Sequence, residues 1–158
     1  MTEEDVVRFV SSMPGVTVFT AGPDNGAPEV AWGDRFIYHD PEGDLPADRK
    51  FPFATIVVTD YPGFDTASDL DRDGVFRVNV AVGREVFAEL FGHPPAAHGE
   101  HHTEYDYAAL DRIVPHPVYA TQGWASVLNP GEETAERTRS LLAGAHARAA
   151  ARSRRRAG

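Results

Sequence analysis

The stretch Val75-Phe76-Arg77-Val78-Asn79-Val80-Ala81-Val82 decides the fold. Successive side chains of a strand point to opposite faces, so this alternation predicts a strand with an apolar face built from Phe76, Val78, Val80 and Val82. The other face carries two polar residues, Arg77 and Asn79. These two residues either face water or make structural hydrogen bonds, or they form part of a site.

The segments on either side of this strand predict more strands, with helices at both ends of the chain. Residues 3–12 read as a helix that opens with a Thr2–Asp5 capping box, residues 83–91 as a short helix closed by Gly92, and the chain after Asn129-Pro130 as a final helix with Glu132 as its capping acid. Strands are expected at 16–20, 29–39, 53–58 and 118–128.

Short connections between successive strands favour antiparallel pairing. The connections before residue 83 are too short, or too rich in proline and aspartate, to hold crossover helices, which argues against a doubly wound parallel sheet. We therefore expect an α+β fold: an antiparallel sheet of about five strands, with an N-terminal helix, a short middle helix and a C-terminal helix packed on one face.

Composition limits both the size of the domain and its partners. The 158 residues are 42% hydrophobic, enough for a single domain over 1–150, and five arginines crowd the C-terminal end, where we expect a basic, disordered tail at 151–158. The net charge of −9 disfavours nucleic-acid binding. The absence of cysteine excludes disulfides and thiolate chemistry. An acidic N-terminus and the lack of a long apolar run indicate a cytoplasmic protein that does not bind membranes, as a monomer or homodimer.

Histidines gather in one segment, which is predicted to be a loop. His93, His98, His101 and His102 stand beside Glu100, Glu104 and Asp106. Imidazoles next to carboxylates suit a divalent transition metal, so His98, His101 and His102 are candidate metal ligands, although their spacing matches no established motif. The alternatives are a lid over a neighbouring pocket or a solvated loop.

An acidic segment resembles the opening of a calcium-binding loop. Asp69-Leu70-Asp71-Arg72-Asp73-Gly74 has the required alternation, but its twelfth position is Val80 instead of a glutamate. An acidic turn ahead of the strand is the competing interpretation.

Polar and aromatic residues also recur where predicted strands meet loops, which is where binding sites are usually built. An arginine could clamp an anion, and tryptophans could wall a flat ligand. The competing interpretation has these residues in structural roles, with both tryptophans in the core. The candidate ligand-binding residues are Trp32, Asp34, Tyr61, Arg77, Asn79, Gln122 and Trp124, and the catalytic candidates are Asp60, Arg77, His98, His101 and His102.

Two functional hypotheses follow. The first is a small-molecule binding protein with its pocket between the sheet and the 93–106 loop, which could act as a cofactor-free or metal-assisted enzyme. The second is a non-catalytic acidic module that binds a protein partner. A buried cluster of Arg77 with Asp60 or histidine in a concave site would favour the first, whereas a flat polar sheet face with disordered histidines would favour the second.

Several longer motifs resemble a known family over nearly the whole chain. They are Trp32-Gly33-Asp34, Pro52 to Val58, Asp60 to Asp65, Phe76 to Val80, Phe87 to Gly92, His116 to Tyr119 and Trp124 to Pro130. Together they resemble a small actinobacterial domain-of-unknown-function family (family 6194), which implies no established activity. More distantly, residues 76–150 resemble YjbR-type proteins, a group that includes one associated with mitomycin resistance. That resemblance implies a small α+β fold with an antiparallel sheet, although this chain has Tyr119 to Gly123 where those proteins carry a lysine-bearing segment.

Overall fold

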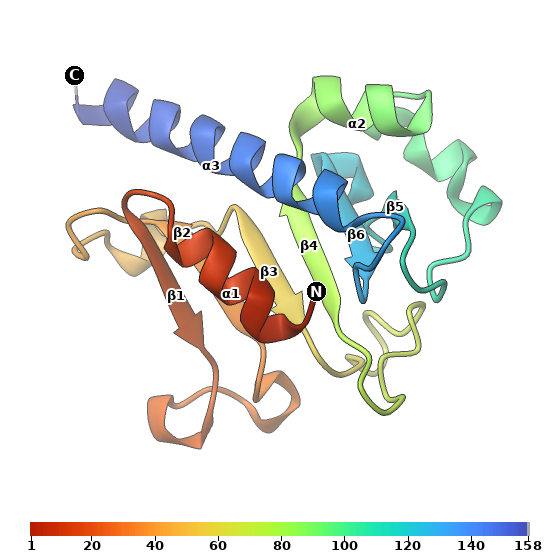
Figure 1. Ribbon diagram of the computed structural model, residues 1–158, viewed down its shortest axis with the longest axis horizontal. Helices are drawn as coiled ribbons and strands as arrows, with labels where there is room; N and C mark the ends of the chain where they lie inside the picture. Colours follow the sequence, from red (N-terminus) through yellow and green to blue (C-terminus); the bar gives the residue numbers. More distant parts are fainter. Residues whose placement is uncertain (158) are drawn as a thin grey trace.

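The computed structural model describes residues 1–157, which form one open antiparallel sheet and three α-helices (Figure 1). The strands lie in the order β1-β2-β3-β4-β6-β5, so the predicted α+β class and antiparallel sheet are confirmed, with six strands instead of about five. The helices are α1 (Glu3–Ser11), α2 (Gly83–Phe91) and α3 (Ala135–Ala157). The strands are β1 (Val16–Thr20), β2 (Arg35–His39), β3 (Ala54–Val57), β4 (Arg77–Ala81), β5 (Ile113–Pro115) and β6 (Trp124–Leu128).

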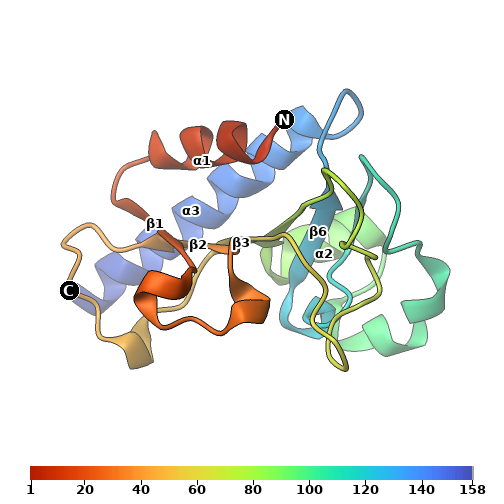
Figure 2. The ribbon, with the colours of Figure 1, turned by 90° about the horizontal axis from the view of Figure 1, so that it is seen from below.

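One face of the sheet is covered by α1 and α3, which lie side by side across the strands (Figure 1). The apolar positions of β4, Val78 and Val80, point to this face and join one buried cluster with residues of α1, α2 and α3. Among them, Leu142 of α3 and Phe87 of α2 are fully buried. In Figure 2 the helix α1 lies on one side of β1–β3, and the turns of residues 23–31, in orange, lie on the other.

The opposite face of β4 is polar and is nevertheless buried. Arg77 is 0% exposed and Asn79 is 1% exposed, because irregular segments between the strands fold over them. Of the two structural alternatives expected for them, exposure to water is therefore wrong, and structural hydrogen bonding is what these side chains show. The sheet has one face packed against helices and a second face on which loops enclose polar groups.

Several local predictions hold. Thr2 and Asp5 form the predicted capping box, with Thr2 Oγ1 accepting from the Asp5 amide at 3.1 Å and an Asp5 carboxylate oxygen accepting from the Thr2 amide at 2.8 Å. Gly92 closes α2 in the left-handed conformation, with φ of 78°. Both signals are local, and local hydrogen bonding suffices to fix them.

Three element boundaries differ from the prediction. Residues 29–31 form a 3₁₀ turn, so the strand expected at 29–39 begins at Arg35, and the strand expected at 118–128 begins at Trp124, after a 3₁₀ turn and Gly123 with φ of 82°. The final helix starts at Ala135. The amides of Gly131, Glu133 and Thr134, just before it, donate to the carboxylate of Asp111 from a distant loop, so Asp111 takes the capping role that was expected of Glu132.

The basic C-terminal segment is helical as far as the structure describes it. α3 continues to Ala157, so residues 151–157 are helix where a disordered tail was expected, and Gly158 lies outside the described residues. No helix within residues 1–157 combines the length and the apolar character needed to cross a bilayer.

Candidate ligand pocket

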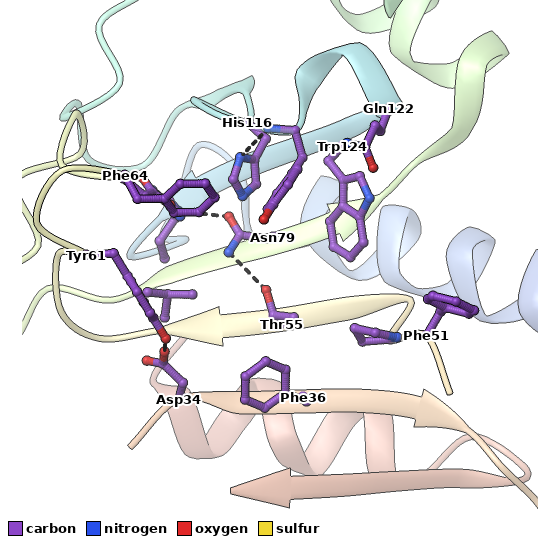
Figure 3. Close-up of a pocket in the computed structure, with 15 residues that line it drawn as sticks. Asp34, Phe36, Phe51, Thr55, Tyr61, Phe64, Asn79, His116, Gln122 and Trp124 are labelled. Atoms are coloured by element: carbon purple, nitrogen blue, oxygen red, sulfur yellow. Dashed lines mark hydrogen bonds and ion pairs between the residues drawn. The ribbon is translucent and has the colours of Figure 1, made fainter. Parts of the chain in front are cut away.

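A cavity of about 430 Å³ opens on the sheet face that the helices leave uncovered. Its floor consists of side chains from β2, β3, β4 and β6, and its walls come from the segments 61–65 and 116–122 (Figure 3). This volume falls in the range of pockets that hold small organic molecules. The lining residues are Asp34, Phe36, Phe51, Pro52, Thr55, Val57, Tyr61, Phe64, Asp65, Arg77, Asn79, His116, Tyr119, Gln122 and Trp124.

The floor holds a buried ion pair between Arg77 and Asp65. The two guanidinium nitrogens Nη1 and Nη2 donate to the two carboxylate oxygens of Asp65 at 3.1 and 2.6 Å. Nη1 also donates to Ser68 Oγ at 2.9 Å, and Nε donates to Asn79 Oδ1 at 2.8 Å. Arg77 is therefore already engaged bidentately by a carboxylate of the protein, and it is not the free anion anchor that the sequence suggested.

Asn79 links three strands through a row of polar side chains. The β-sheet register places Thr55 of β3 and Ser126 of β6 opposite Asn79. Asn79 Nδ2 donates to Thr55 Oγ1 at 3.0 Å, while Ser126 Oγ donates to Asn79 Oδ1 at 2.6 Å (Figure 3). Together with the bond from Arg77, these contacts fix the amide orientation and hold the pocket floor rigid.

Asp34 and Tyr61 form a second polar pair at one end of the cavity. The Tyr61 hydroxyl donates a short hydrogen bond to Asp34 Oδ2, and the Val58 amide donates to Asp34 Oδ1 at 3.0 Å (Figure 3). Burial raises the pKa of Asp34, and burial together with the neighbouring carboxylate raises the pKa of Tyr61. Tyr61 therefore stays protonated, and with its proton committed to Asp34 it can offer only an oxygen lone pair to a ligand.

His116 supplies a hydrogen-bond donor from the opposite wall. Its Nδ1 accepts from the amides of Val118 and Tyr119, both at 2.9 Å, which requires the proton of the neutral ring to sit on Nε2. Burial, helped by the positive charge of Arg77, lowers the pKa of His116 to about 3, so the ring is neutral near pH 7. Among the described residues Nε2 has no hydrogen-bond partner, and His116, only 3% exposed, lines the cavity.

Aromatic rings make up most of the remaining wall. Trp124 and Phe36 lie over the sheet, and Phe64 packs against Tyr119 with 6.1 Å between ring centroids (Figure 3). Phe51 and Phe64, at the edge of the cavity, are 77% and 57% exposed. Such exposure of large rings beside a cavity is typical of a binding surface.

The predicted ligand-binding residues come together with one exception. Asp34, Tyr61, Arg77, Asn79, Gln122 and Trp124 all line the cavity. Trp32 lies outside it, 40% exposed, and its indole nitrogen donates to the Ala27 carbonyl at 2.9 Å. Asp60 is also outside, where its carboxylate accepts from the Leu70 amide at 2.9 Å and orders the 60–70 loop.

The histidine segment forms a separate cluster and does not line this cavity, which corrects the expected position of the pocket. Residues 93–106 contain two 3₁₀ turns and pack beside α2. His98 is 4% exposed, its Nδ1 lies 3.2 Å from His93 Nε2, and its Nε2 lies 3.0 Å from the Tyr107 hydroxyl. Burial and the neighbouring histidines lower the pKa of His98 to about 4.

Two of the candidate metal ligands, His98 and His102, contact the Tyr107 hydroxyl, and the third pairs with a carboxylate. His101 Nδ1 pairs with Glu104 at 2.6 Å, whereas His102 Nδ1 lies 3.1 Å from the Tyr107 hydroxyl. Over residues 1–157 no group of three or more histidine or carboxylate side chains is arranged to hold a metal ion, and this includes the 69–74 segment. The metal hypothesis for His98, His101 and His102 remains a prediction.

Sequence reasoning missed the two residues that define the chemistry of the pocket, Asp65 and His116. Asp65 follows the turn Tyr61-Pro62-Gly63-Phe64, and no periodic signal indicates that this turn folds back onto β4. His116 stands between prolines, a pattern that indicates only irregular backbone. Asp65 pairs with Arg77, and His116 lines the cavity, through contacts that only the folded chain brings about.

The chain matches the model of a family of unknown function, DUF6194, over residues 1–158, and it belongs to this family. No curated protein and no solved structure gives a match. The more distant resemblance to YjbR-type proteins remains a prediction.

Proposed function

We propose that this DUF6194 member binds a small organic molecule in the cavity on the uncovered face of its sheet. The observation that carries the proposal is the combination of an aromatic wall with a rigid polar floor. A network of hydrogen bonds holds the floor in one arrangement before any ligand arrives. Its members are Arg77, Asp65, Asn79, Thr55 and Ser126. Preorganisation of this kind reduces the entropic cost of binding.

The competing hypothesis, an acidic protein-interaction module, would be favoured by a flat, solvated sheet face. Here the uncovered face is concave and its polar residues are buried. The histidine segment, which the same hypothesis expects to be disordered, has defined contacts around Tyr107. Both observations favour small-molecule binding.

A chemical step in the pocket would have to use groups that the cavity presents. Asp34 with Tyr61 offers an acceptor, and the neutral imidazole of His116 offers a donor that can polarise a carbonyl oxygen. The proposal gives no part in such a chemical step to the catalytic candidates that do not line the cavity, which are Asp60, His98, His101 and His102.

The two tryptophans allow a direct test of the proposal. The sequence contains only Trp32 and Trp124, so Trp32→Phe leaves Trp124 as the single indole reporter inside the pocket. A fragment library is titrated against this ¹⁵N-labelled variant, and we expect saturable shifts of the Trp124 indole signal and of the Val118 and Tyr119 amides. Residues 82–86, which line a separate pocket together with Arg148, serve as the control region. If no fragment shifts the Trp124 signal in a saturable way, the proposal is wrong.

A further inference from the structure

The charges that line the pocket restrict which ligand it accepts. Within the described residues the lining contains one cation, Arg77, and two carboxylates, Asp34 and Asp65. Arg77 donates through Nη1 and Nη2 to the carboxylate of Asp65, with bonds of 3.1 and 2.6 Å, and its remaining bonds go to Ser68 and Asn79. At 0% exposure its guanidinium is not offered to a ligand. An anionic ligand would thus meet no uncompensated positive charge and would face the carboxylate of Asp34.

His116 offers the cavity a hydrogen-bond donor. His116 is almost completely buried, and its Nε2–H has no partner among the described residues. Nε2 faces the cavity, where water can accept from it in the free protein, so a ligand binds well at this position only if it offers an acceptor in place of that water. The neutral ring remains a donor near pH 7 and cannot act as a cation.

The shape of the wall supplies the third restriction. Trp124 and Phe36 lie over the sheet, and the Phe64–Tyr119 pair forms the outer wall. Rings in such positions favour a flat aromatic ligand that can stack against them.

Resting on the proposed function, we infer that the pocket selects a flat, non-anionic aromatic molecule that carries an acceptor atom, such as a carbonyl oxygen, for the Nε2–H of His116. Carboxylates and phosphates of the same size are discriminated against. The selection comes from Asp65, which neutralises Arg77 from within the protein. This inference reverses the expectation, drawn from sequence, that Arg77 anchors an anion.

The test uses two probes of nearly the same shape and different charge, 1-naphthamide and 1-naphthoate. Both are titrated at pH 7 into the Trp32→Phe variant of the full chain, with the Trp124 indole signal as readout. We expect 1-naphthamide to bind at least about tenfold more tightly than 1-naphthoate, because the pocket provides a donor and no free cation. Equal or tighter binding of 1-naphthoate with the same Trp124 shifts would overturn the inference and leave the proposed function intact.

A variant of His116 tests the donor separately. His116→Asn keeps an acceptor near the position of Nδ1 for the amides of Val118 and Tyr119 and removes the Nε2–H. We expect it to weaken 1-naphthamide binding by about tenfold, the value of one lost hydrogen bond to a buried group. Unchanged 1-naphthamide affinity in a folded variant would remove His116 from the assignment. If the variant does not fold, the comparison of the two probes in the Trp32→Phe protein still decides the matter.

Discussion

Removing the Asp65 carboxylate should destabilise the protein strongly, because it leaves the Arg77 guanidinium charged and buried. Arg77 is 0% exposed and Asp65 is 7% exposed, so the guanidinium would lose its charged partner while it remains largely shielded from bulk water. Breaking a buried pair in this way costs about 3–5 kcal/mol. For a domain of this size that corresponds to a drop in melting temperature on the order of 10 °C.

The assay is urea unfolding of Asp65→Ala at pH 7, followed by circular dichroism. Glu4→Ala is the matched control, because Glu4 pairs with Arg35 at 2.7 Å on the surface and is 67% exposed. An exposed pair contributes at most about 1 kcal/mol, so this control should barely change the free energy of unfolding.

Two further measurements separate the charge effect from a simple loss of packing. Sodium formate should stabilise Asp65→Ala more than sodium chloride of equal ionic strength, since formate can occupy the vacated carboxylate position beside Arg77. The double variant Asp65→Ala/Arg77→Met should recover much of the lost stability, because it removes the uncompensated charge. In Asp65→Ala the freed Arg77 should also raise the affinity for 1-naphthoate relative to 1-naphthamide.

If Asp65→Ala unfolds at the same urea concentration as Glu4→Ala, the buried pair of Arg77 and Asp65 does not stabilise the fold as we expect. The expectation is also wrong if formate stabilises the wild type and Asp65→Ala equally, because a specific anion site beside Arg77 would then not exist.

Three other outcomes can be checked by the same unfolding assay. The pKa of His116 is about 3 in the folded protein and 6.5 in the unfolded chain, so its contribution to the free energy of unfolding is complete above pH 6.5 and is lost as the pH falls toward 3. The wild type should therefore lose about 3 kcal/mol of stability from this group by pH 4, a loss that His116→Asn lacks. Parallel pH profiles of the two proteins would contradict this. Tyr107→Phe should cost about 1–2 kcal/mol, because the hydroxyl donates to the His102 carbonyl at 2.8 Å and contacts His98, and an unchanged midpoint would show that these bonds add nothing. Trp124→Ala should cost less than the roughly 3–5 kcal/mol of a core aromatic, because the ring lines an open pocket, so a loss of that full size would place it in the core.

The parts of the fold that were predictable are those fixed by local or periodic signals. The alternation of Val78 and Val80 identified β4 and its apolar face, and Thr2 with Asp5 identified the start of α1. The strand expected at 118–128 was wrong because its apolar and β-branched residues hide a 3₁₀ turn that ends at Gly123, where φ is 82°. Composition favours a strand there, but the amides of Val118 and Tyr119 donate to His116 Nδ1, and Gly123 takes a left-handed conformation just before the strand begins.

The site was predictable in its strand residues and not in its loop residues. Arg77 and Asn79 were visible as polar interruptions of an apolar strand, whereas Asp65 and His116 reach them through irregular segments. The dense histidine segment attracted attention for its composition, yet His98 there is held by His93 and Tyr107 in a cluster of its own. Closeness in sequence indicated a cluster correctly, and it gave no information about which cavity the cluster would face.

The polar row on β4 is hard to explain by stability alone. Replacing a buried ion pair by apolar side chains of similar volume is often neutral or stabilising, so a sheet face designed only for packing has no need of Arg77 and Asp65. Their bonds instead hold Asn79, and through it Thr55 and Ser126, in a single orientation at the bottom of an aromatic cavity. Positions where a local rule is broken in this way are expected at functional sites. The network therefore has the properties of a preorganised binding floor, in which the protein's own carboxylate determines the charge that a ligand can carry.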